Sequence, residues 1–157
     1  GAPVPDASAP AADSAPRRMQ ILAAEDNKTN RFVLSKMLQK MRIDLHFAED
    51  GVAAVERFTE LAPDLVFMDI SMPRMDGKEA ARRIRDIETD LGLDRVPIVA
   101  MTAHAMAGDR EEILAAGIDH YMTKPLKRAL IEAQIAENCP AACEDPHPLE
   151  DAQATAV

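Results

Sequence analysis

Short apolar runs alternate with amphipathic stretches along the middle of the chain. The apolar runs are of strand length, while the stretches between them repeat apolar side chains every three or four positions, as helices do. The five predicted strands are residues 19–24, 44–48, 65–68, 97–101 and 119–122. The five predicted helices are residues 28–41, 52–61, 77–90, 109–116 and 127–138.

Three of the predicted strands, residues 19–24, 65–68 and 97–101, are apolar at nearly every position rather than at every second one. Continuous apolarity is typical of strands that are covered on both faces, and hence of a parallel sheet between two layers of helices. Five strand–helix units joined by short connections form a doubly wound α/β fold. In such sheets ligands bind beyond the carboxyl ends of the strands, so the residues after each strand are the candidate site.

The two ends of the chain differ in composition from this middle part. The first 16 residues contain six Ala and four Pro, which predicts a disordered linker over residues 1–17. Residues 139–157 are rich in Pro and acids without apolar periodicity, which predicts a disordered tail. The folded domain is therefore expected to cover residues 18–138. Cys139 and Cys143, in the tail, are expected to be free thiols in a reducing compartment.

Charge and composition exclude several classes of function. A net charge of −9 and only five aromatic residues, four Phe and one Tyr, argue against a nucleic-acid partner. The basic residues Arg82, Arg83 and Arg85 are expected to lie on a solvated helix face. No apolar run is long enough to span a membrane, and a signal peptide is not expected because no basic segment followed by an apolar stretch opens the chain. We expect a cytoplasmic domain that makes no membrane contact itself, although its parent protein could be anchored.

Charged and hydroxyl side chains follow four of the five strands. Glu25 and Asp26 follow the first strand, Asp69 the third, Thr102 the fourth and Lys124 the fifth. Because the carboxyl ends of parallel strands share one edge of the sheet, these side chains should converge. Three crowded carboxylates repel one another unless cations join them, and Lys124 together with Mg²⁺ would balance their charge. An all-oxygen ligand set with room for water suits Mg²⁺ better than Zn²⁺.

This combination of groups is suited to phosphoryl transfer. An aspartate carboxylate can act as a nucleophile and form an aspartyl phosphate. The transfer itself needs mostly positioning and charge neutralisation, which a metal ion and a lysine provide. The Thr102 hydroxyl could hydrogen-bond a phosphoryl oxygen. Asp69 is therefore the candidate nucleophile, with Thr102 and Lys124 as its assistants.

Four segments of the chain resemble the receiver domains of two-component signalling. These segments are AEDNKTNR (24–31), MDISMPRMDG (68–77), IVAMTA (98–103) and YMTKPL (121–126). The resemblance covers about residues 18–138 in order and spacing. It implies a CheY-like or flavodoxin-like five-stranded sheet of order 2-1-3-4-5 with five helices.

The same resemblance implies roles for individual residues. Asp69 would be the phosphoacceptor, and the backbone carbonyl of Ser71 would join the carboxylates as a Mg²⁺ ligand. Thr102 would be the switch hydroxyl and Lys124 the phosphate contact, after a strand in which Tyr121 occupies the aromatic switch position. The peptide bond between Lys124 and Pro125 is expected to be cis. The acidic pair that holds the metal would be Glu25 and Asp26.

The residues of two motifs are similar to those in the receivers of hybrid histidine kinases. These are EDNKTNR, with its Asn30-Arg31 pair, and the stretch TAHAMAGDREEILAAGIDHYMTKPL (102–126). The resemblance implies a monomeric domain that takes a phosphoryl group from a histidine kinase or a histidine phosphotransfer protein. Such a domain catalyses its own phosphorylation and dephosphorylation. The alternative is a stand-alone single-domain response regulator that acts as a signal carrier or phosphate sink.

Two other classes of protein share this type of sheet. A pseudo-receiver has the fold without the chemistry, but it has no need of the crowded acidic cluster. A flavodoxin-like cofactor binder needs a loop rich in Gly and hydroxyl groups after the first strand to hold phosphate. Here that loop reads AEDNKTN, whose carboxylates repel phosphate in the absence of a metal.

Overall fold

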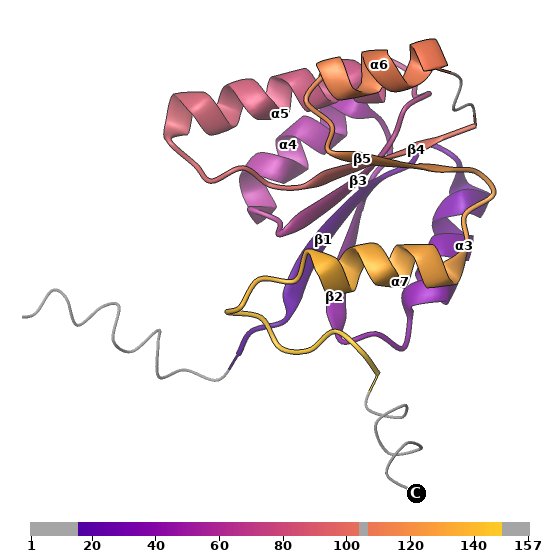
Figure 1. Ribbon diagram of the computed structural model, residues 1–157, viewed down its shortest axis with the longest axis vertical. Coiled ribbons are helices and arrows are strands. Elements are labelled where there is room, and N and C mark those ends of the chain that lie inside the picture. Colours follow the sequence, from indigo (N-terminus) through magenta and orange to yellow (C-terminus); the bar gives the residue numbers. More distant parts are fainter. Residues whose placement is uncertain (1–15, 104–106, 149–157) are drawn as a thin grey trace, which may run out of the picture.

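The computed structural model describes residues 16–103 and 107–148, in which five strands alternate with five helices (Figure 1). The strands are β1 (Met19–Ala24), β2 (Ile43–Ala48), β3 (Leu65–Asp69), β4 (Ile98–Thr102) and β5 (His120–Thr123). The helices are α3 (Lys28–Leu38), α4 (Gly51–Leu61), α5 (Gly77–Leu91), α6 (Ala107–Ala115) and α7 (Arg128–Glu137). None of these helices is long and apolar enough to cross a membrane.

All strand pairs are parallel, and the sheet has the order β2-β1-β3-β4-β5. Helices α4, α5 and α6 cover one face of the sheet, and α3 and α7 cover the other (Figure 1). The predicted doubly wound α/β fold and its strand order are therefore confirmed. In this order β3 is central, with β1 on one side and β4 on the other, so the ends of these three strands are neighbours.

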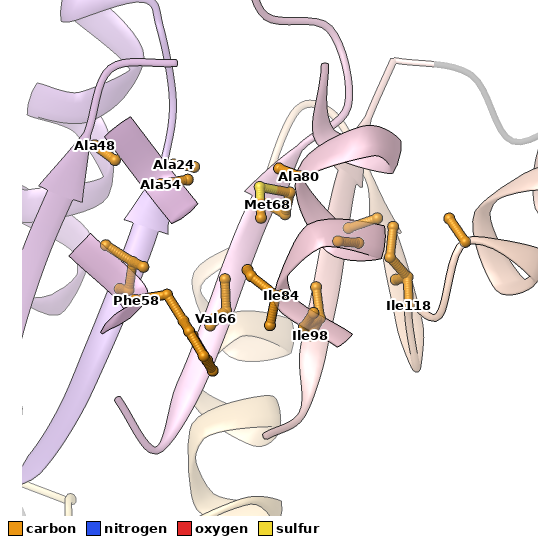
Figure 2. Close-up of a cluster of buried hydrophobic side chains, with 14 of the residues drawn as sticks. Ala24, Ala48, Ala54, Phe58, Val66, Met68, Ala80, Ile84, Ile98 and Ile118 are labelled. Atoms are coloured by element: carbon orange, nitrogen blue, oxygen red, sulfur yellow. The ribbon is translucent and has the colours of Figure 1, made fainter. Parts of the chain in front are cut away.

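Side chains that alternate along the buried strands divide the core into two clusters, one on each face. Val66 and Ile98 point to the first face, where they meet Phe58 of α4 and Ile84 of α5 (Figure 2). Phe67 and Val99, one position further along, belong to the second cluster; that cluster also contains residues of α3 and α7. Burial on both faces explains why β3 and β4 are apolar almost throughout.

Side-chain caps begin the three helices that follow β1, β2 and β3. Asn27 accepts the N–H of Asn30 at the start of α3, and Asp50 accepts that of Ala53 at the start of α4. Asp76 does the same for α5. Each cap satisfies a backbone donor that the first helical turn leaves without an intrahelical partner. These helices therefore begin at defined residues close to the carboxyl edge of the sheet.

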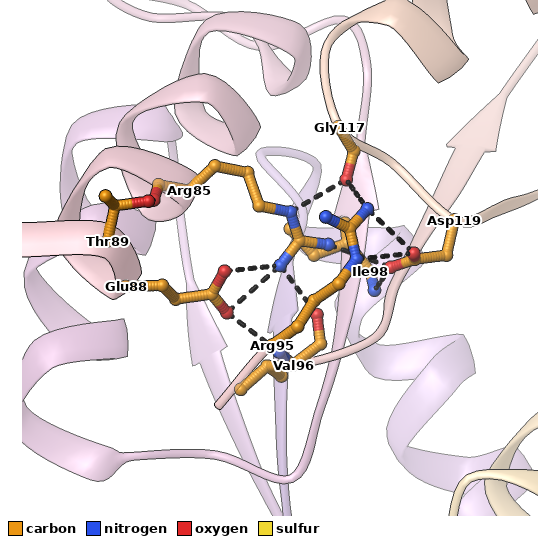
Figure 3. Close-up of polar contacts among 8 residues, drawn as sticks. All are labelled: Arg85, Glu88, Thr89, Arg95, Val96, Ile98, Gly117 and Asp119. Atoms are coloured by element: carbon orange, nitrogen blue, oxygen red, sulfur yellow. Dashed lines mark hydrogen bonds and ion pairs between the residues drawn. The ribbon is translucent and has the colours of Figure 1, made fainter. Parts of the chain in front are cut away.

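A polar network at the opposite edge joins α5 to the starts of β4 and β5 (Figure 3). The Arg85 guanidinium donates to Glu88, to Asp119 and to the backbone carbonyls of Val96 and Gly117. Asp119 also accepts the backbone N–H of Ile98 at 2.9 Å. Arg85 was expected on a solvated face together with Arg82 and Arg83; its neighbours are indeed exposed, but Arg85 is largely buried. Carbonyl and carboxylate partners from other elements compensate for its burial.

Residues 139–148, which we call the C-terminal strap, lie against the domain. Arg17 and Cys143 form a parallel backbone bridge: the Arg17 N–H donates to Ala142, and the Glu144 N–H donates to the Arg17 carbonyl. Further along, the Arg42 N–H donates to the Pro146 carbonyl at 2.9 Å. Cys143 is only 9% exposed and belongs to the second core cluster.

The strap differs from the disordered tail that was expected after residue 138, and Arg17 is likewise part of the fold rather than of a linker. The strap is held mainly by backbone hydrogen bonds and by one buried thiol. Neither produces an apolar period in the sequence, so a pattern-based boundary falls too early. Both cysteines are free, as expected. The remainder of the expected linker and tail, residues 1–15 and 149–157, lies outside the described residues.

Candidate functional site

The candidate residues gather at the carboxyl edge of the sheet, where the sequence places them. Asp69 is the last residue of β3 and Thr102 the last of β4, and both are buried. Glu25 follows β1 directly and is 1% exposed, whereas Asp26 beside it is exposed. Lys124 follows β5. The edge therefore combines a buried acidic pair with one carboxylate that is open to solvent.

The three carboxylates and the lysine are close neighbours. One oxygen from each of Glu25, Asp26 and Asp69 lies within 4.8 Å of the others. The Lys124 ammonium lies 3.2 Å from Glu25 Oε1 and 3.3 Å from Asp69 Oδ2. A single ammonium thus faces two buried carboxylates, and it cannot neutralise all three acids.

Burial and crowding set the protonation of this cluster. Burial, and next the Glu25 carboxylate, raise the pKa of Asp69 to about 7. Burial works in the same direction on Glu25, but hydrogen bonds with Asp69 and with the Asn27 N–H outweigh it and lower the pKa of Glu25. Although burial opposes it, the Asp69 and Glu25 charges raise the pKa of Lys124. Asp69 and Glu25 therefore share a proton near neutral pH unless a further cation joins them.

Such a cluster has the donors that a hard divalent cation prefers. Its ligand atoms are all oxygens, they are few, and Asp26 opens to water, which suits Mg²⁺ better than Ca²⁺ or Zn²⁺. Because a metal ligand must be deprotonated, a bound cation would displace the proton shared by Asp69 and Glu25.

Asn30 and Arg31 of α3, together with the cap residue Asn27, hold Glu25 in place, and the sequence had not given them this role. The Arg31 guanidinium donates to the Glu25 carbonyl at 2.9 Å. The Asn30 amide donates to Glu25 Oε2 at 3.4 Å, and the Asn27 N–H reaches the same oxygen at 3.2 Å. These contacts give the Asn30-Arg31 pair a local function that its resemblance alone did not explain.

The loop after Asp69 returns to the end of β3. The Ser71 N–H donates to Asp69 Oδ1 at 3.2 Å, and the Gly77 N–H donates to the Ile70 carbonyl at 3.0 Å. A Cβ atom at residue 77 would collide with the Asp69 carbonyl. Gly77 is thus needed for a close approach to the site, in addition to the turn chemistry that the sequence suggests.

Thr102, Lys124 and Tyr121 lie along the neighbouring strands. The Lys124 N–H donates to the Thr102 carbonyl at 2.8 Å, and the Lys124–Pro125 peptide bond is cis, as expected. Tyr121 is half-buried against the first core cluster, and Arg110 of α6 donates to its hydroxyl at 3.3 Å. Tyr121 therefore connects β5 with α6.

Residues 21–136 match the family model of the response regulator receiver domain. The chain belongs to this family. Over 152 residues, which is 97% of its length, this chain is 35% identical to the sensor protein GacS of Pseudomonas syringae pv. syringae. It is 40% identical, over 117 residues and 71% of its length, to hybrid signal transduction histidine kinase I of Dictyostelium discoideum. The match to this chain covers only 16% of the length of the first relative and 7% of the length of the second.

Solved receiver domains have the same architecture. One is the receiver domain of sensor histidine kinase PA1611 from Pseudomonas aeruginosa PAO1, which has a magnesium ion coordinated in its active site cleft. It is 37% identical with a TM-score of 0.69, and the match covers 77% of this chain and 97% of that one. Another match is the Saccharomyces cerevisiae complex of the histidine phosphotransfer protein Ypd1 with the receiver domain of Ssk1. Here the identity is 33%, the TM-score 0.74 and the coverage 84% and 97%.

Proposed function

We propose that this receiver domain accepts a phosphoryl group on Asp69 from a phosphohistidine of a histidine kinase or a histidine phosphotransfer protein. Mg²⁺ would be held by Glu25, Asp26 and Asp69 together with the Ser71 carbonyl. The observation that carries the proposal is the Asp69 carboxylate, which is 3% exposed and surrounded by two further carboxylates and the Lys124 ammonium. A buried acidic cluster of this kind is costly for a scaffold and useful for phosphoryl transfer.

Different side chains of the domain make different contributions to this reaction. A carboxylate oxygen of Asp69 forms a bond to phosphorus while the bond from phosphorus to the histidine nitrogen breaks, and that nitrogen keeps the electron pair. Lys124, already 3.3 Å from Asp69, balances charge on the transferred group. The Thr102 hydroxyl, at the end of the adjacent strand, donates to one of its oxygens. Bound Mg²⁺ supplies the remaining neutralisation. Attack by water on the same phosphorus later restores the carboxylate.

A partner can approach the site over the face made by α3 and the loop after β5. A groove of about 560 Å³ lies there, lined by Glu25 and Lys124 and by apolar residues such as Val33, Met37 and Leu126. Val33, which lines the groove, is 43% exposed. Exposed apolar side chains next to a reactive centre are typical of a protein-binding surface. The phosphohistidine-bearing partner is the occupant that this function requires.

The relatives support a place for the domain within a hybrid sensor histidine kinase, and we propose that this part of such a protein lies in the cytoplasm. The chain matches a small fraction of each of them, so the rest of such a protein would lie outside these 157 residues. The gene sequence next to this segment tests that context directly. A kinase catalytic domain encoded beside it supports the hybrid arrangement, and its absence would favour the stand-alone regulator.

The acceptor is tested with acetyl phosphate and Mg²⁺, followed by intact-protein mass spectrometry. The wild type is expected to gain one phosphoryl group, and Asp69→Asn should gain none because an amide is a far poorer nucleophile. Asp90→Asn, which changes an exposed aspartate of α5, is the matched control and should be labelled like the wild type. Stoichiometric labelling of Asp69→Asn at another residue would contradict the assignment.

A further inference from the structure

We propose that the ion pair between Asp50 and Arg74 is a clamp that positions the loop after Asp69 and thereby sets the affinity of the site for Mg²⁺. Arg74 is on this view a positioning residue for the metal ligands. The inference rests on the proposed function, since it concerns the same metal site. It assigns a role to two residues that lie in different loops and that make no contact with the acidic cluster in the interactions described above.

One end of the loop is fixed to the site itself. Residues 70–76 join β3 to α5. Near the start of this loop the Ser71 N–H donates to Asp69 Oδ1, and just after its end the Gly77 N–H donates to the Ile70 carbonyl. The N–H of Ile70 also donates to the Met101 carbonyl of β4. The proposed carbonyl ligand, that of Ser71, thus lies in the first part of this loop, and its position depends on how the outer part is held.

The outer part of the loop is held by the start of α4. Arg74 donates from Nε and Nη2 to Asp50 Oδ2, at 2.9 and 2.6 Å. The other oxygen of Asp50 caps α4 by accepting the Ala53 N–H at 2.8 Å. Asp50 is buried although Arg74 is 63% exposed in its side chain. One carboxylate therefore joins the helix start and the loop with charge-assisted hydrogen bonds.

A backbone contact beside the ion pair fixes the distance between the two loops. The Gly51 N–H donates to the Met75 carbonyl at 3.1 Å, and a Cβ atom at residue 51 would collide with that carbonyl. Arg74 itself has a φ of 66°, in the left-handed region that non-glycine residues adopt at a cost. The ion pair stabilises this conformation. Without it the loop has one anchor fewer, and the site must order the loop when it binds the cation.

The sign of the effect separates positioning from simple electrostatics. Arg74 is a cation, so its removal should by charge alone strengthen the binding of a divalent cation nearby. A clamp predicts the opposite, because a ligand that must be ordered on binding lowers the affinity. The pair itself should contribute little to unfolding stability, since Arg74 is exposed. Metal affinity and melting temperature should therefore respond separately.

The experiment is a titration of the wild type and its variants with MgCl₂, followed by ¹H–¹⁵N NMR, with melting temperatures measured in metal-free buffer. Arg74→Ala should weaken Mg²⁺ binding roughly three- to tenfold, less than the ~10–100-fold typical of groups bonded directly to a metal ligand. Arg74→Lys, which keeps the charge but not the two-pronged contact, should recover part of the affinity. Arg83→Ala removes another exposed arginine, paired with Glu79 on α5, and should leave the affinity unchanged.

Asp50→Asn provides the second arm because asparagine still caps a helix. It should weaken Mg²⁺ binding as Arg74→Ala does, and the double variant should be no weaker than either single one, as for two residues that act through one contact. Unchanged or tighter Mg²⁺ binding by Arg74→Ala would overturn the clamp while leaving the metal site intact. Failure of the wild type to bind Mg²⁺ would instead overturn the proposed function on which the clamp rests.

Discussion

At the scale of single residues, Asp64 fastens the start of the folded chain with a largely buried side chain. Its side chain is 9% exposed and accepts both terminal nitrogens of Arg17 at 2.8 Å, as well as the Gln20 N–H at 2.8 Å. Burial works to raise the pKa of Asp64, but the Arg17 guanidinium and the Gln20 N–H outweigh it and lower this pKa. The charged form is thus favoured in the folded state, so Asp64 stabilises the fold above its unfolded pKa.

Replacing Asp64 should therefore have an effect that depends on pH. Asp64→Asn is expected to lower the free energy of unfolding at pH 7 by about 1–2 kcal/mol, because an amide is a weaker acceptor than a carboxylate for the exposed Arg17 guanidinium and the partly buried Gln20 N–H. As the pH falls below the unfolded pKa of about 4, the unfolded state takes up a proton that the folded state resists, so the difference should shrink, and it is lost once the pH passes through the lowered pKa of the folded state. Urea unfolding at pH 7 and at pH 3 measures both values. Asp44→Asn, in a half-exposed pair with Arg18, should cost less than ~1 kcal/mol, and a pH-independent loss for Asp64→Asn would contradict the argument.

The convergence of Glu25, Asp26, Asp69 and Lys124 could be predicted because it follows from the ends of parallel strands, which the apolar runs mark. Other residue-scale features could not. The burial of Arg85 depends on partners that immediately precede β4 and β5, and the need for glycine at residue 77 depends on the Asp69 carbonyl. Both are set by neighbours that are distant in sequence or visible only in the folded backbone.

At the scale of elements, the sequence predicts type and order well and boundaries within a few residues. All ten predicted elements are present, and β1 begins and ends where expected, at Met19–Ala24. The largest difference is in α3, which ends at Leu38 although the apolar repeat continues to Met41. Met41 still points into the core, because its N–H donates to the Leu38 carbonyl in a turn that leads into β2. A helical repeat can thus continue beyond the helix itself.

The contact between β5 and α6 gives a prediction about signalling. If the Thr102 hydroxyl moves toward a phosphoryl group on Asp69, it vacates space beside β5, and Tyr121 can turn inward and lose its hydrogen bond from Arg110. Beryllofluoride, which mimics the phosphoryl group, should then shift backbone NMR signals from the site to Tyr121 and along α6. Thr102→Ala should confine the shifts to the neighbours of Asp69.

The matched control for this experiment is Thr59→Ala, which changes an exposed hydroxyl on α4. It should leave the spread of shifts as in the wild type. Wild-type shifts that stop at the neighbours of Asp69 would mean that this domain passes on phosphate without the proposed switch. The coupling needs only a difference of a few kcal/mol between two packings, so ~1–5 kcal/mol of altered contact at Tyr121 is enough.

At the scale of the whole molecule, the C-terminal strap shows where sequence patterns stop being informative. The domain boundary expected at residue 138 excludes a segment that buries Cys143 and pairs with both Arg17 and Arg42. Arg42 also forms an ion pair with Glu144 at 2.7 Å. Backbone pairing carries no side-chain period, and the prolines of the strap resemble those of a linker. Its order follows from a surface that exists only after the sheet has formed.

Shortening the chain at two places tests how much the strap contributes. Residues 16–148 should keep the free energy of unfolding of the full chain within ~0.5 kcal/mol, because they contain all five strands and five helices of the described fold. Residues 16–138 should lose roughly 1–3 kcal/mol, because this form lacks the buried Cys143 side chain and the hydrogen bonds of the strap. Urea denaturation of the three proteins measures the difference. Equal stability of the two shortened forms would mean that the strap lies on the domain without stabilising it.

The bridge between Arg17 and Cys143 affects how the domain would move if other polypeptide were attached to it. It places the entry of the folded chain beside the C-terminal strap at the amino ends of the strands, one strand length, or roughly 15–20 Å, from Asp69. Any polypeptide attached at either end would therefore join the domain at the amino ends of the strands, opposite Asp69. A rotation of the domain about this point of attachment moves the Asp69 edge through an arc while the attachment point itself stays still. The domain is in this sense a lever with its pivot and its reactive tip at opposite ends.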